Sequence, residues 1–299
     1  MKVKQKKSAL LPGLITALMV VAAVAGGLRM TDPDGGQLDT MRQELETITA
    51  ENEGLTAQVE ALRTETAEQK ALPEAIQKQK DEGFRLLGEL ERQIRAGESD
   101  KRIAYLTFDD GPYDNTTDAI LDILKEKGVH ATFFLRHRPD HVAQIQREIR
   151  EGHTLANHSY SHKIKAVYQS ADSCIKEIRD QQKWLTETVG VTPEIYRFPG
   201  GSPTAGNKKQ AIAAALAADG LGYVDWNCAT GDGLPGVLTT EKAYQNAVSS
   251  VGEQKIVVML MHDYSAATLE ALPDIIDTLK AKGYMMMPLF RESVMIRSA

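Results

Sequence analysis

Three patterns of hydrophobic and polar positions follow one another along this chain. A mostly apolar run extends from Ala9 to Leu28, which is long enough to cross a bilayer, because a spanning helix needs about 20 residues. Apolar residues then recur at alternating steps of three and four, a spacing that predicts a helix with one hydrophobic seam. From Lys101 onward, short apolar runs alternate with amphipathic stretches, as in domains that alternate strands and helices. These patterns divide the chain into residues 1–30, 37–97 and 101–299.

Residues 1–30 are interpreted as an uncleaved transmembrane helix that anchors the protein to the cell membrane. Four lysines precede the apolar run, and positive charge before a span favours a cytoplasmic start. A signal peptide cleaved near Ala25 is the alternative, since Ala23 and Ala25 give a small-x-small pattern. Either interpretation predicts that everything after Leu28 lies outside the cytoplasm.

Residues 37–97 are expected to form a coiled-coil stalk that holds two copies of the chain together as a homodimer. The seam contains the apolar residues Leu38, Met41, Leu45, Ile48, Leu55, Val59 and Leu62. Asn52 occupies one further seam position. A single Asn at a core position favours a two-stranded register. Pro73 is expected to break or kink the helix, and Leu87, Leu90 and Ile94 return to the same frame after it. The alternative is a helix folded back on its own domain.

Residues 101–299 predict parallel strands joined by helical crossovers, and hence an α/β sheet or barrel. The expected strands are 103–108, 131–135, 154–156, 195–198, 223–226, 256–261 and 284–289. The expected helices are 116–127, 140–151, 171–189, 208–218, 240–251 and 269–282. In barrels of this kind, active-site residues sit at the carboxyl ends of the strands.

Composition and charge say little about which molecules the protein binds. The net charge of −6 gives no basis for binding nucleic acid, and a hydrophobic content of 42% supports a packed core. Cys174 and Cys228 match neither a zinc-ligand nor a redox spacing. Buried, unreactive thiols are the favoured interpretation, and a disulfide in an exported protein is the alternative.

Candidate metal ligands follow the first and third expected strands. Asp109 and Asp110 end the first, where two buried carboxylates are costly unless something neutralises them. His158 and His162 stand four residues apart, close enough on one helical turn to share a metal ion. With Asp110 they form a set of two imidazoles and one carboxylate that leaves a coordination position for water, as catalytic zinc sites do. Alone, each motif is also compatible with a solvated turn or with surface histidines.

Candidate groups for orienting a carboxylate and moving a proton follow two later strands. Arg197 ends the fourth and can hold a carboxylate through a planar, bidentate contact. His262 ends the sixth, where an imidazole is placed to act as acid or base. A hydrogen-bonded core histidine is the alternative interpretation of His262.

The segments Thr-Phe-Asp-Asp-Gly-Pro, Asn-His-Ser-Tyr-Ser-His, Arg-Phe-Pro-Gly-Gly and Leu-Met-His-Asp occur in this order from Thr107 to Asp263. In these segments the region from Lys101 to Leu289 resembles the polysaccharide deacetylases of carbohydrate esterase family 4, also called the NodB homology domain. The resemblance implies a distorted (β/α) barrel with seven or eight strands. It also implies a metal-dependent hydrolase that removes acetyl groups from N-acetylated sugars.

The resemblance assigns a role to each candidate residue. It implies that Asp109 is the general base, that Arg197 orients it, and that His262 is the general acid with Asp232 as its partner. The implied metal ligands are Asp110, His158 and His162. Pro199, Gly200 and Leu260 are expected to contact the substrate, and Leu260 is implied to line the pocket for the acetyl methyl. Trp226 is a further candidate for substrate contact.

Two departures from the family pattern affect the walls of the sugar groove. Gly200 and Gly233 stand where the family often has an aromatic residue and a Trp. Trp226 is a candidate for one missing wall, although it fits a core position equally well. Asp225 is a weaker rival to Asp232 as the partner of His262.

The function expected from this resemblance and from the location is deacetylation of N-acetylglucosamine in peptidoglycan, with Zn²⁺ as the expected metal and Co²⁺ or Mn²⁺ as alternatives. N-acetylmuramic acid, chitin oligomers and acetylxylan are alternative substrates. A non-catalytic, glycan-binding coiled-coil scaffold is a hypothesis of another class. The presence of every ligand and proton carrier argues against it.

Overall fold

The computed structural model describes residues 36–293 and 296–297. The expected membrane anchor lies outside these residues. Within the described part of the chain, none of the helices is both long and apolar enough to span a membrane. The chain divides into two compact units, Met1–Lys80 and Asp81–Ala299.

Helix α2 (Gly36–Ala96) contains the whole predicted seam in one element. The expected break at Pro73 does not occur, because the helix continues through this residue. Proline keeps a backbone angle compatible with a helix and removes one hydrogen bond, a cost that a long helix can absorb. Whether two copies of α2 pair as a coiled coil stays a prediction.

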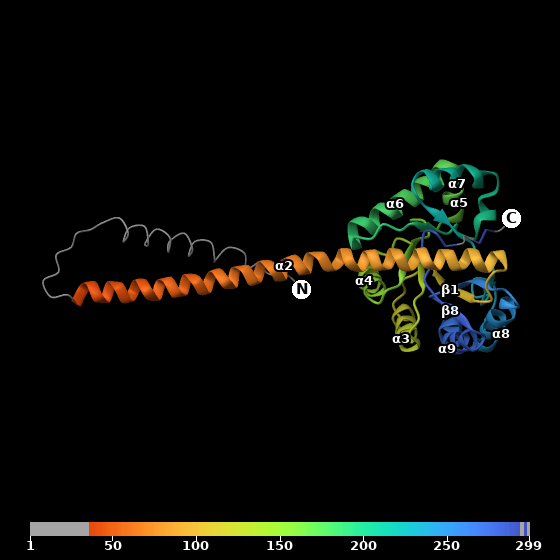
Figure 1. Ribbon diagram of the computed structural model, residues 1–299. Helices are drawn as coiled ribbons and strands as arrows, with labels where there is room; N and C mark the ends of the chain where they lie inside the picture. The colour runs from red at the N-terminus through yellow and green to blue at the C-terminus, as the bar shows by residue number, and fades with distance from the viewer. Residues whose placement is uncertain (1–35, 294–295, 298–299) are drawn as a thin grey trace. The chain divides into compact units, whose positions relative to one another are not determined.

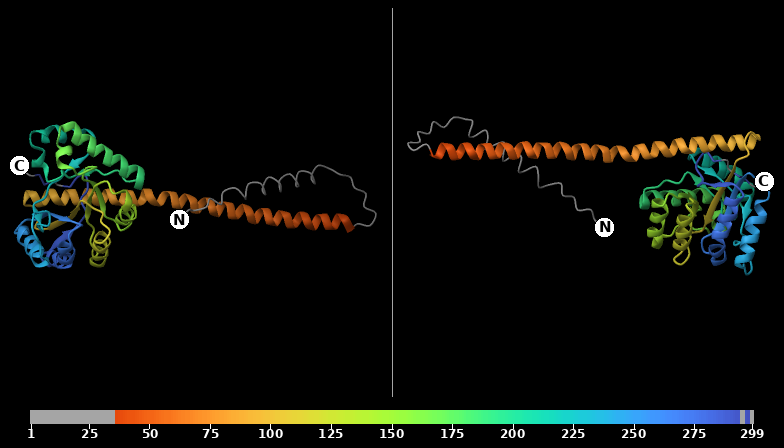
Figure 2. Two further views of the ribbon diagram at one scale, coloured as in Figure 1. Left: turned by 180° about the vertical axis from the view of Figure 1, so that it is seen from behind. Right: turned by 60° about the horizontal axis from the view of Figure 1, so that its bottom comes forward.

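The last turns of α2 belong to the unit that begins at Asp81. The side chains of Leu87 and Ile94 are buried in the core of this unit, and the ring of Phe84 stacks on that of Phe290 with 5.0 Å between the centroids. Figure 2 shows these orange-yellow turns beside the sheet. These seam positions therefore pack on their own domain, and the domain starts before Lys101, where the sequence placed its boundary.

Eight strands form one parallel sheet in the order β5-β4-β3-β2-β1-β7-β6, and β8 pairs with β1 beside β2. The strands are β1 (Arg102–Asp109), β2 (Thr132–Leu135), β3 (Thr154–Asn157), β4 (Ile195–Tyr196), β5 (Gly222–Tyr223), β6 (Cys228–Ala229), β7 (Ile256–His262) and β8 (Tyr284–Met286). In the described residues, β5 and β6 end the sheet without pairing to each other. The expected barrel is therefore an open one, and β6 was not predicted.

All six expected helices are present in the second unit. The helices are α3 (Thr117–Lys127), η1 (Pro139–His141), α4 (Val142–Arg150), α5 (Ile164–Val167), α6 (Ala171–Val189), η2 (Ser202–Lys208), α7 (Lys209–Ala218), α8 (Thr240–Val251) and α9 (Ala266–Ala281). The short α5 was not predicted. Helix α9 begins three residues early because the Ser265 hydroxyl caps it by accepting from the Thr268 N–H. Figure 1 shows α3, α8 and α9 together near β1 and β8, with α5, α6 and α7 grouped apart from them.

The two faces of the sheet have different coverings. Leu106 and Phe108 of β1 belong to an outer hydrophobic cluster, which α3, α4, α8 and α9 cover. Ile103 and Tyr105 belong to an inner cluster on the opposite face, which also contains Leu87 and Leu289. Successive side chains of a strand point to opposite faces. Thr107 and Asp109 therefore continue the second, inner face, where the apolar interior ends in polar groups.

Both cysteines are buried and free. Cys174 lies beside the Tyr196 hydroxyl in one cluster, whereas Cys228 packs in another. Burial raises the pKa of each thiol to about 11, so almost none of either is thiolate at neutral pH. The interpretation of both as buried, unreactive thiols is confirmed.

Candidate metal centre and active site

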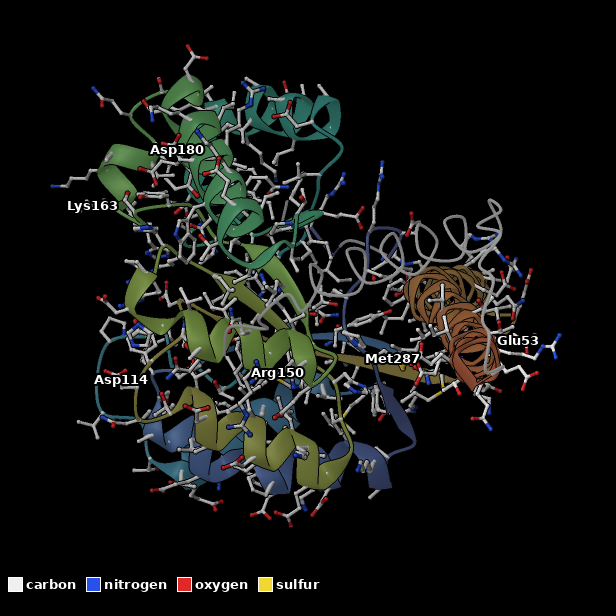
Figure 3. All side chains as sticks on the ribbon, turned by 90° about the vertical axis from the view of Figure 1, so that its left-hand side faces the viewer. Glu53, Asp114, Arg150, Lys163, Asp180 and Met287 are labelled. Carbon is white, nitrogen blue, oxygen red and sulfur yellow. The ribbon has the colours of Figure 1, made fainter. Side chains whose placement is uncertain are left out.

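The carboxyl ends of β1, β3, β4 and β7 carry the candidate residues. Asp109 ends β1 and lies opposite His262 of β7 in the register of the sheet. His158 and Arg197 directly follow β3 and β4. Figure 3 shows Asp114 and Lys163, from the connections after β1 and β3, on the same side of the domain. The parallel sheet thus brings the predicted site together from segments far apart in the sequence.

Asp110, His158 and His162 form a cluster whose ligand atoms all lie within 4.8 Å of one another. The His162 Nε2 and the Asp110 Oδ1 are 3.5 Å apart. A tetrahedral zinc site with bonds near 2.1 Å separates its ligands by roughly 3.4 Å. The Asp110 Oδ1 is buried and accepts no hydrogen bond. These residues therefore fit a divalent metal ion.

The backbone around this cluster is unusual. Asp110, Ser159 and His162 have φ values of 79°, 69° and 55°. Residues other than glycine seldom adopt this left-handed region, and they persist there when surrounding contacts hold them. Such conformations gather at functional sites, which agrees with a ligand role for Asp110 and His162.

The protonation states of the cluster suit metal binding. The His158 Nδ1–H donates to the Arg197 carbonyl at 2.8 Å, which leaves its Nε2 lone pair for a metal. Burial, reinforced by His158, lowers the pKa of His162 to about 4, so its imidazole is neutral at pH 7. Burial alone would raise the pKa of Asp110, but His158, His162 and Arg136 outweigh it and lower that pKa. Neutral imidazoles and an ionised carboxylate are what a metal ion requires.

Asp109 is held by one oxygen and faces the cluster with the other. Its Oδ1 accepts a 2.8 Å hydrogen bond from the Arg197 Nη1, and its Oδ2 lies 3.6 Å from the His158 Nε2. The expected bidentate contact is not formed, because the other Arg197 nitrogens donate elsewhere. Arg197 also donates to the Thr107 hydroxyl and to the carbonyls of Val224 and Asp225, and its guanidinium lies 4.0 Å from the Phe134 ring centroid.

His262 is oriented by Asp232. Its Nδ1–H donates to the Asp232 Oδ1 at 2.8 Å, while the Asp232 Oδ2 accepts from the His262 backbone N–H and the Thr268 hydroxyl. Burial by itself lowers the pKa of His262, but the carboxylates of Asp232 and Asp109 outweigh it and raise that pKa. The rival Asp225 accepts from the N–H and hydroxyl of Ser202, so it fixes the loop after Arg197.

The expected substrate contacts are less well defined. Gly200 is exposed with a φ of 73°, and Leu260 is buried. Trp226 is half-buried: it packs against the inner cluster and beside Gly201, and it also lines a surface pocket with Asn227. The Pro199 carbonyl accepts from the Tyr168 hydroxyl.

The sequence reasoning missed two arginines at the site. Arg136 lies 3.5 Å from the Asp110 Oδ1, and the Arg138 Nη2 donates to the Asp110 carbonyl at 3.5 Å. The available signal was their position directly after the strand at 131–135, where catalytic groups are expected.

The polysaccharide deacetylase family model matches residues 96–221. A putative polysaccharide deacetylase of Bacillus subtilis, YheN, is 35% identical over 201 residues, which are 64% of this chain and 68% of that protein. A peptidoglycan-N-acetylglucosamine deacetylase of Bacillus cereus is 30% identical over 65% of this chain and 71% of its own length. The crystal structure of the catalytic domain of a Eubacterium rectale peptidoglycan N-acetylglucosamine deacetylase matches with a TM-score of 0.63 and 35% identity, over 66% of this chain and 93% of that one.

Proposed function

Since the chain belongs to the polysaccharide deacetylase family, we propose that it hydrolyses N-acetyl groups of N-acetylglucosamine residues in peptidoglycan. The observation that carries the proposal is the Asp110–His158–His162 cluster with two different proton carriers beside it. Asp109 lies next to His158, and His262 lies opposite Asp109 across the β1–β7 pairing.

Asp110, His158 and His162 would hold the metal ion, for which we propose Zn²⁺, with Co²⁺ and Mn²⁺ as alternatives. When bound, such an ion polarises the acetamide carbonyl and lowers the pKa of a water from 15.7 to about 7. The carboxylate and imidazole donors suit all three metals.

The proton transfers belong to Asp109 and His262. As the water oxygen attacks the acetamide carbon, the Asp109 Oδ2 accepts its proton, while Arg197 holds the Oδ1 in place. The C–N bond then breaks, and the sugar nitrogen takes a proton from the His262 Nε2. That nitrogen is turned away from Asp232, which binds Nδ1. Acetate and a free amino sugar leave, and a backbone N–H near Gly200 is proposed to stabilise the oxyanion.

Peptidoglycan is favoured as the polymer because two relatives named for that substrate are 30% and 35% identical to the chain. N-acetylmuramic acid, chitin oligomers and acetylxylan are the alternatives, since each presents an acetyl group to the same chemistry. The non-catalytic scaffold stays disfavoured, because the three candidate ligands cluster and both proposed proton carriers are held by a partner, Asp109 by Arg197 and His262 by Asp232.

The test is acetate release by the full chain, stripped of metal and assayed with and without added Zn²⁺. Peptidoglycan and N-acetylglucosamine oligomers serve as substrates. Zinc-dependent acetate release supports the proposal, and the polymer with the higher kcat/KM is the better substrate. A chain that binds zinc and releases acetate from neither polymer would overturn it.

Asp232→Asn is expected to move the alkaline limit of activity to lower pH. The Asp232 carboxylate raises the pKa of His262, and its loss lowers that pKa. A general acid is active only while protonated, so activity then falls at a lower pH. The profile of kcat against pH measures the shift. An unchanged alkaline limb would contradict the assignment of His262 as the acid.

Gly233→Ala is expected to lower kcat about tenfold or more. A Cβ at this position would lie 2.7 Å from the His262 Cε1, closer than real contacts allow, so the imidazole must move. Gly236→Ala controls for added volume in the same connection, because no atom lies within 4 Å of its Cβ position, although its φ of 115° adds strain. If kcat for acetate release is unchanged in Gly233→Ala, the position of His262 is not critical.

Cell location and oligomeric state form a separate proposal. The apolar run of residues 9–28 supports anchoring to the outer side of the cell membrane, with release after cleavage near Ala25 as the alternative. The seam before Pro73 supports a homodimer. Membrane fractionation tests the first, and analytical ultracentrifugation of the purified chain tests the second. A monomer at micromolar concentration would contradict the dimer.

A further inference from the structure

Arg136 and Arg138 place two positive charges at the rim of the metal centre. The Arg136 side chain is 25% exposed, and its Nη1 lies 3.5 Å from the Asp110 Oδ1. The Arg138 guanidinium lies over the Tyr113 ring, 4.3 Å from the centroid. The two side chains therefore approach the same metal ligand, one at its carboxylate and one at its carbonyl.

Tyr113 and Tyr264 connect these arginines to the general acid. The two tyrosine rings meet edge to face with 5.7 Å between centroids, and the Tyr264 ring lies 5.1 Å from the His262 ring. Tyr264 is 40% exposed. A solvent-facing aromatic strip thus runs from His262 to Arg138 along the edge of the site.

Arg138 has no carboxylate partner among the described residues, unlike Arg147 and Arg197, which are also partly or fully buried. Arg147 pairs with three carboxylates, and Arg197 with Asp109. Among the residues that the structure describes, Arg138 forms no ion pair, and its Nε is buried without a hydrogen-bond partner. A buried donor left unsatisfied is costly unless a ligand or water completes it.

Metal binding leaves this rim more positive. Asp110 is the one carboxylate in the described chain that pairs with Arg136, and a divalent ion would share its charge. Asp263, on the other side of Gly111, is buried and accepts a hydrogen bond from the Thr117 hydroxyl at 2.6 Å, so it does not pair with either arginine. Asp109 is already neutralised by Arg197. Among the described residues, the charge of Arg138 is therefore not balanced by a paired carboxylate at this rim.

We propose that Arg136 and Arg138 bind a glycan carboxylate close to the acetamide under attack, so that the enzyme prefers acidic N-acetylated sugars to neutral ones. This inference rests on the proposed deacetylation and specifies its substrate. The lactyl ether of N-acetylmuramic acid is one source, because this sugar is linked directly to the N-acetylglucosamine residues of peptidoglycan. A carboxylate of an attached stem peptide is the other source. A planar guanidinium matches either through paired N–H donors.

The test compares oligosaccharides of alternating N-acetylglucosamine and N-acetylmuramic acid in three forms, with chitotetraose as the neutral reference. In the first form the lactyl carboxylate is free, in the second it is a primary amide, and in the third it carries a stem peptide. The full chain, with bound zinc quantified, is assayed for acetate release. Arg138→Gln and Arg136→Gln are the variants, and Arg150→Gln, an exposed arginine that Figure 3 shows apart from Asp114 and Lys163, is the control.

The wild-type chain is expected to prefer the free acid to its amide by about tenfold or more in kcat/KM, since a hydrogen bond to a charged group is lost in the amide. Arg138→Gln is expected to bring that ratio close to one through KM, and Arg150→Gln to preserve it. A preference seen only with the peptide-bearing form supports the proposal with the carboxylate on the peptide.

Equal rates on acid, amide and peptide forms would overturn the inference and leave the deacetylation intact. A second result would also overturn it. If Arg138→Gln and Arg136→Gln lowered kcat/KM by the same factor on every substrate and also lost bound zinc, the arginines would only support Asp110. Acetate from none of the oligosaccharides, including chitotetraose, would instead be a failure of the proposed function.

Discussion

Asp109→Asn is expected to lower the kcat for acetate release by about 10²–10⁴-fold, the range that a positioned general base contributes. The amide keeps the size of the side chain but cannot take the proton of the attacking water. Its oxygen can still accept from the Arg197 Nη1, which donates to the Asp109 Oδ1 in the native chain. The fold should therefore be retained, and the loss should lie in kcat rather than in KM.

Zinc content separates this effect from a loss of metal. Asp109 is outside the three-residue cluster, so Asp109→Asn should bind one zinc per chain like the wild type. His158→Ala removes a ligand and should lose both zinc and activity. Zinc quantified by elemental analysis and acetate release are the two readouts. Full activity in Asp109→Asn would show that another group takes the proton.

Removal of residues 1–100 is expected to abolish folding, whereas removal of residues 1–80 should preserve it. The shorter fragment loses the buried Leu87 and Ile94, each worth about 1.5–3 kcal/mol, and the Phe84–Phe290 stack. It also loses the buried Glu91, which accepts a hydrogen bond from the Tyr105 hydroxyl. These losses approach the whole stability of a typical domain, about 5–15 kcal/mol. Circular dichroism and thermal melting of both fragments measure the difference.

A matched pair of leucines isolates the contribution of this helix face. Leu87→Ala is expected to cost about 2–5 kcal/mol of unfolding free energy, because it leaves a cavity in the core. Leu86→Ala removes a side chain that is 54% exposed and should cost about 0.5 kcal/mol or less. Urea unfolding of the fragment from residue 81 measures both. Equal effects of the two substitutions would mean that the last turns of α2 do not stabilise the domain.

Periodicity predicted most of the fold of residues 101–299. Seven of the eight strands and six helices follow from alternating apolar runs, since long elements such as β7 and α6 carry strong patterns. The two-residue strand β6 and the four-residue helix α5 are too short to show a period, whereas the equally short β4 and β5 were found because the longer runs 195–198 and 223–226 mark them. The start of the domain was misplaced for another reason. Leu87 and Ile94 fit a coiled-coil frame as well as they fit a domain core. Only the tertiary structure shows that they pack with residues of β1 and β2 in the inner cluster.

The candidate site was predictable where a motif and a strand end coincide. Asp110, His158 and His162 come together as the sequence predicted. Arg197 holds Asp109 through one nitrogen and not through the bidentate contact that an arginine can make, because backbone carbonyls and Thr107 accept its other N–H groups. Arg138 has no motif of its own. Its place at the site depends on how the connection after β2 folds over Tyr113, which no local pattern specifies.

The two ends of the second unit meet in one cluster, where Phe84 stacks on Phe290 and Leu289 packs with Leu87. During synthesis, Phe84 leaves the ribosome long before Phe290 does. The inner layer beneath Asp109 and Arg197 therefore cannot close until the chain is nearly complete, although the face covered by α3 and α4 can form earlier. Products of interrupted translation should for this reason lack activity even when they contain every ligand and proton carrier.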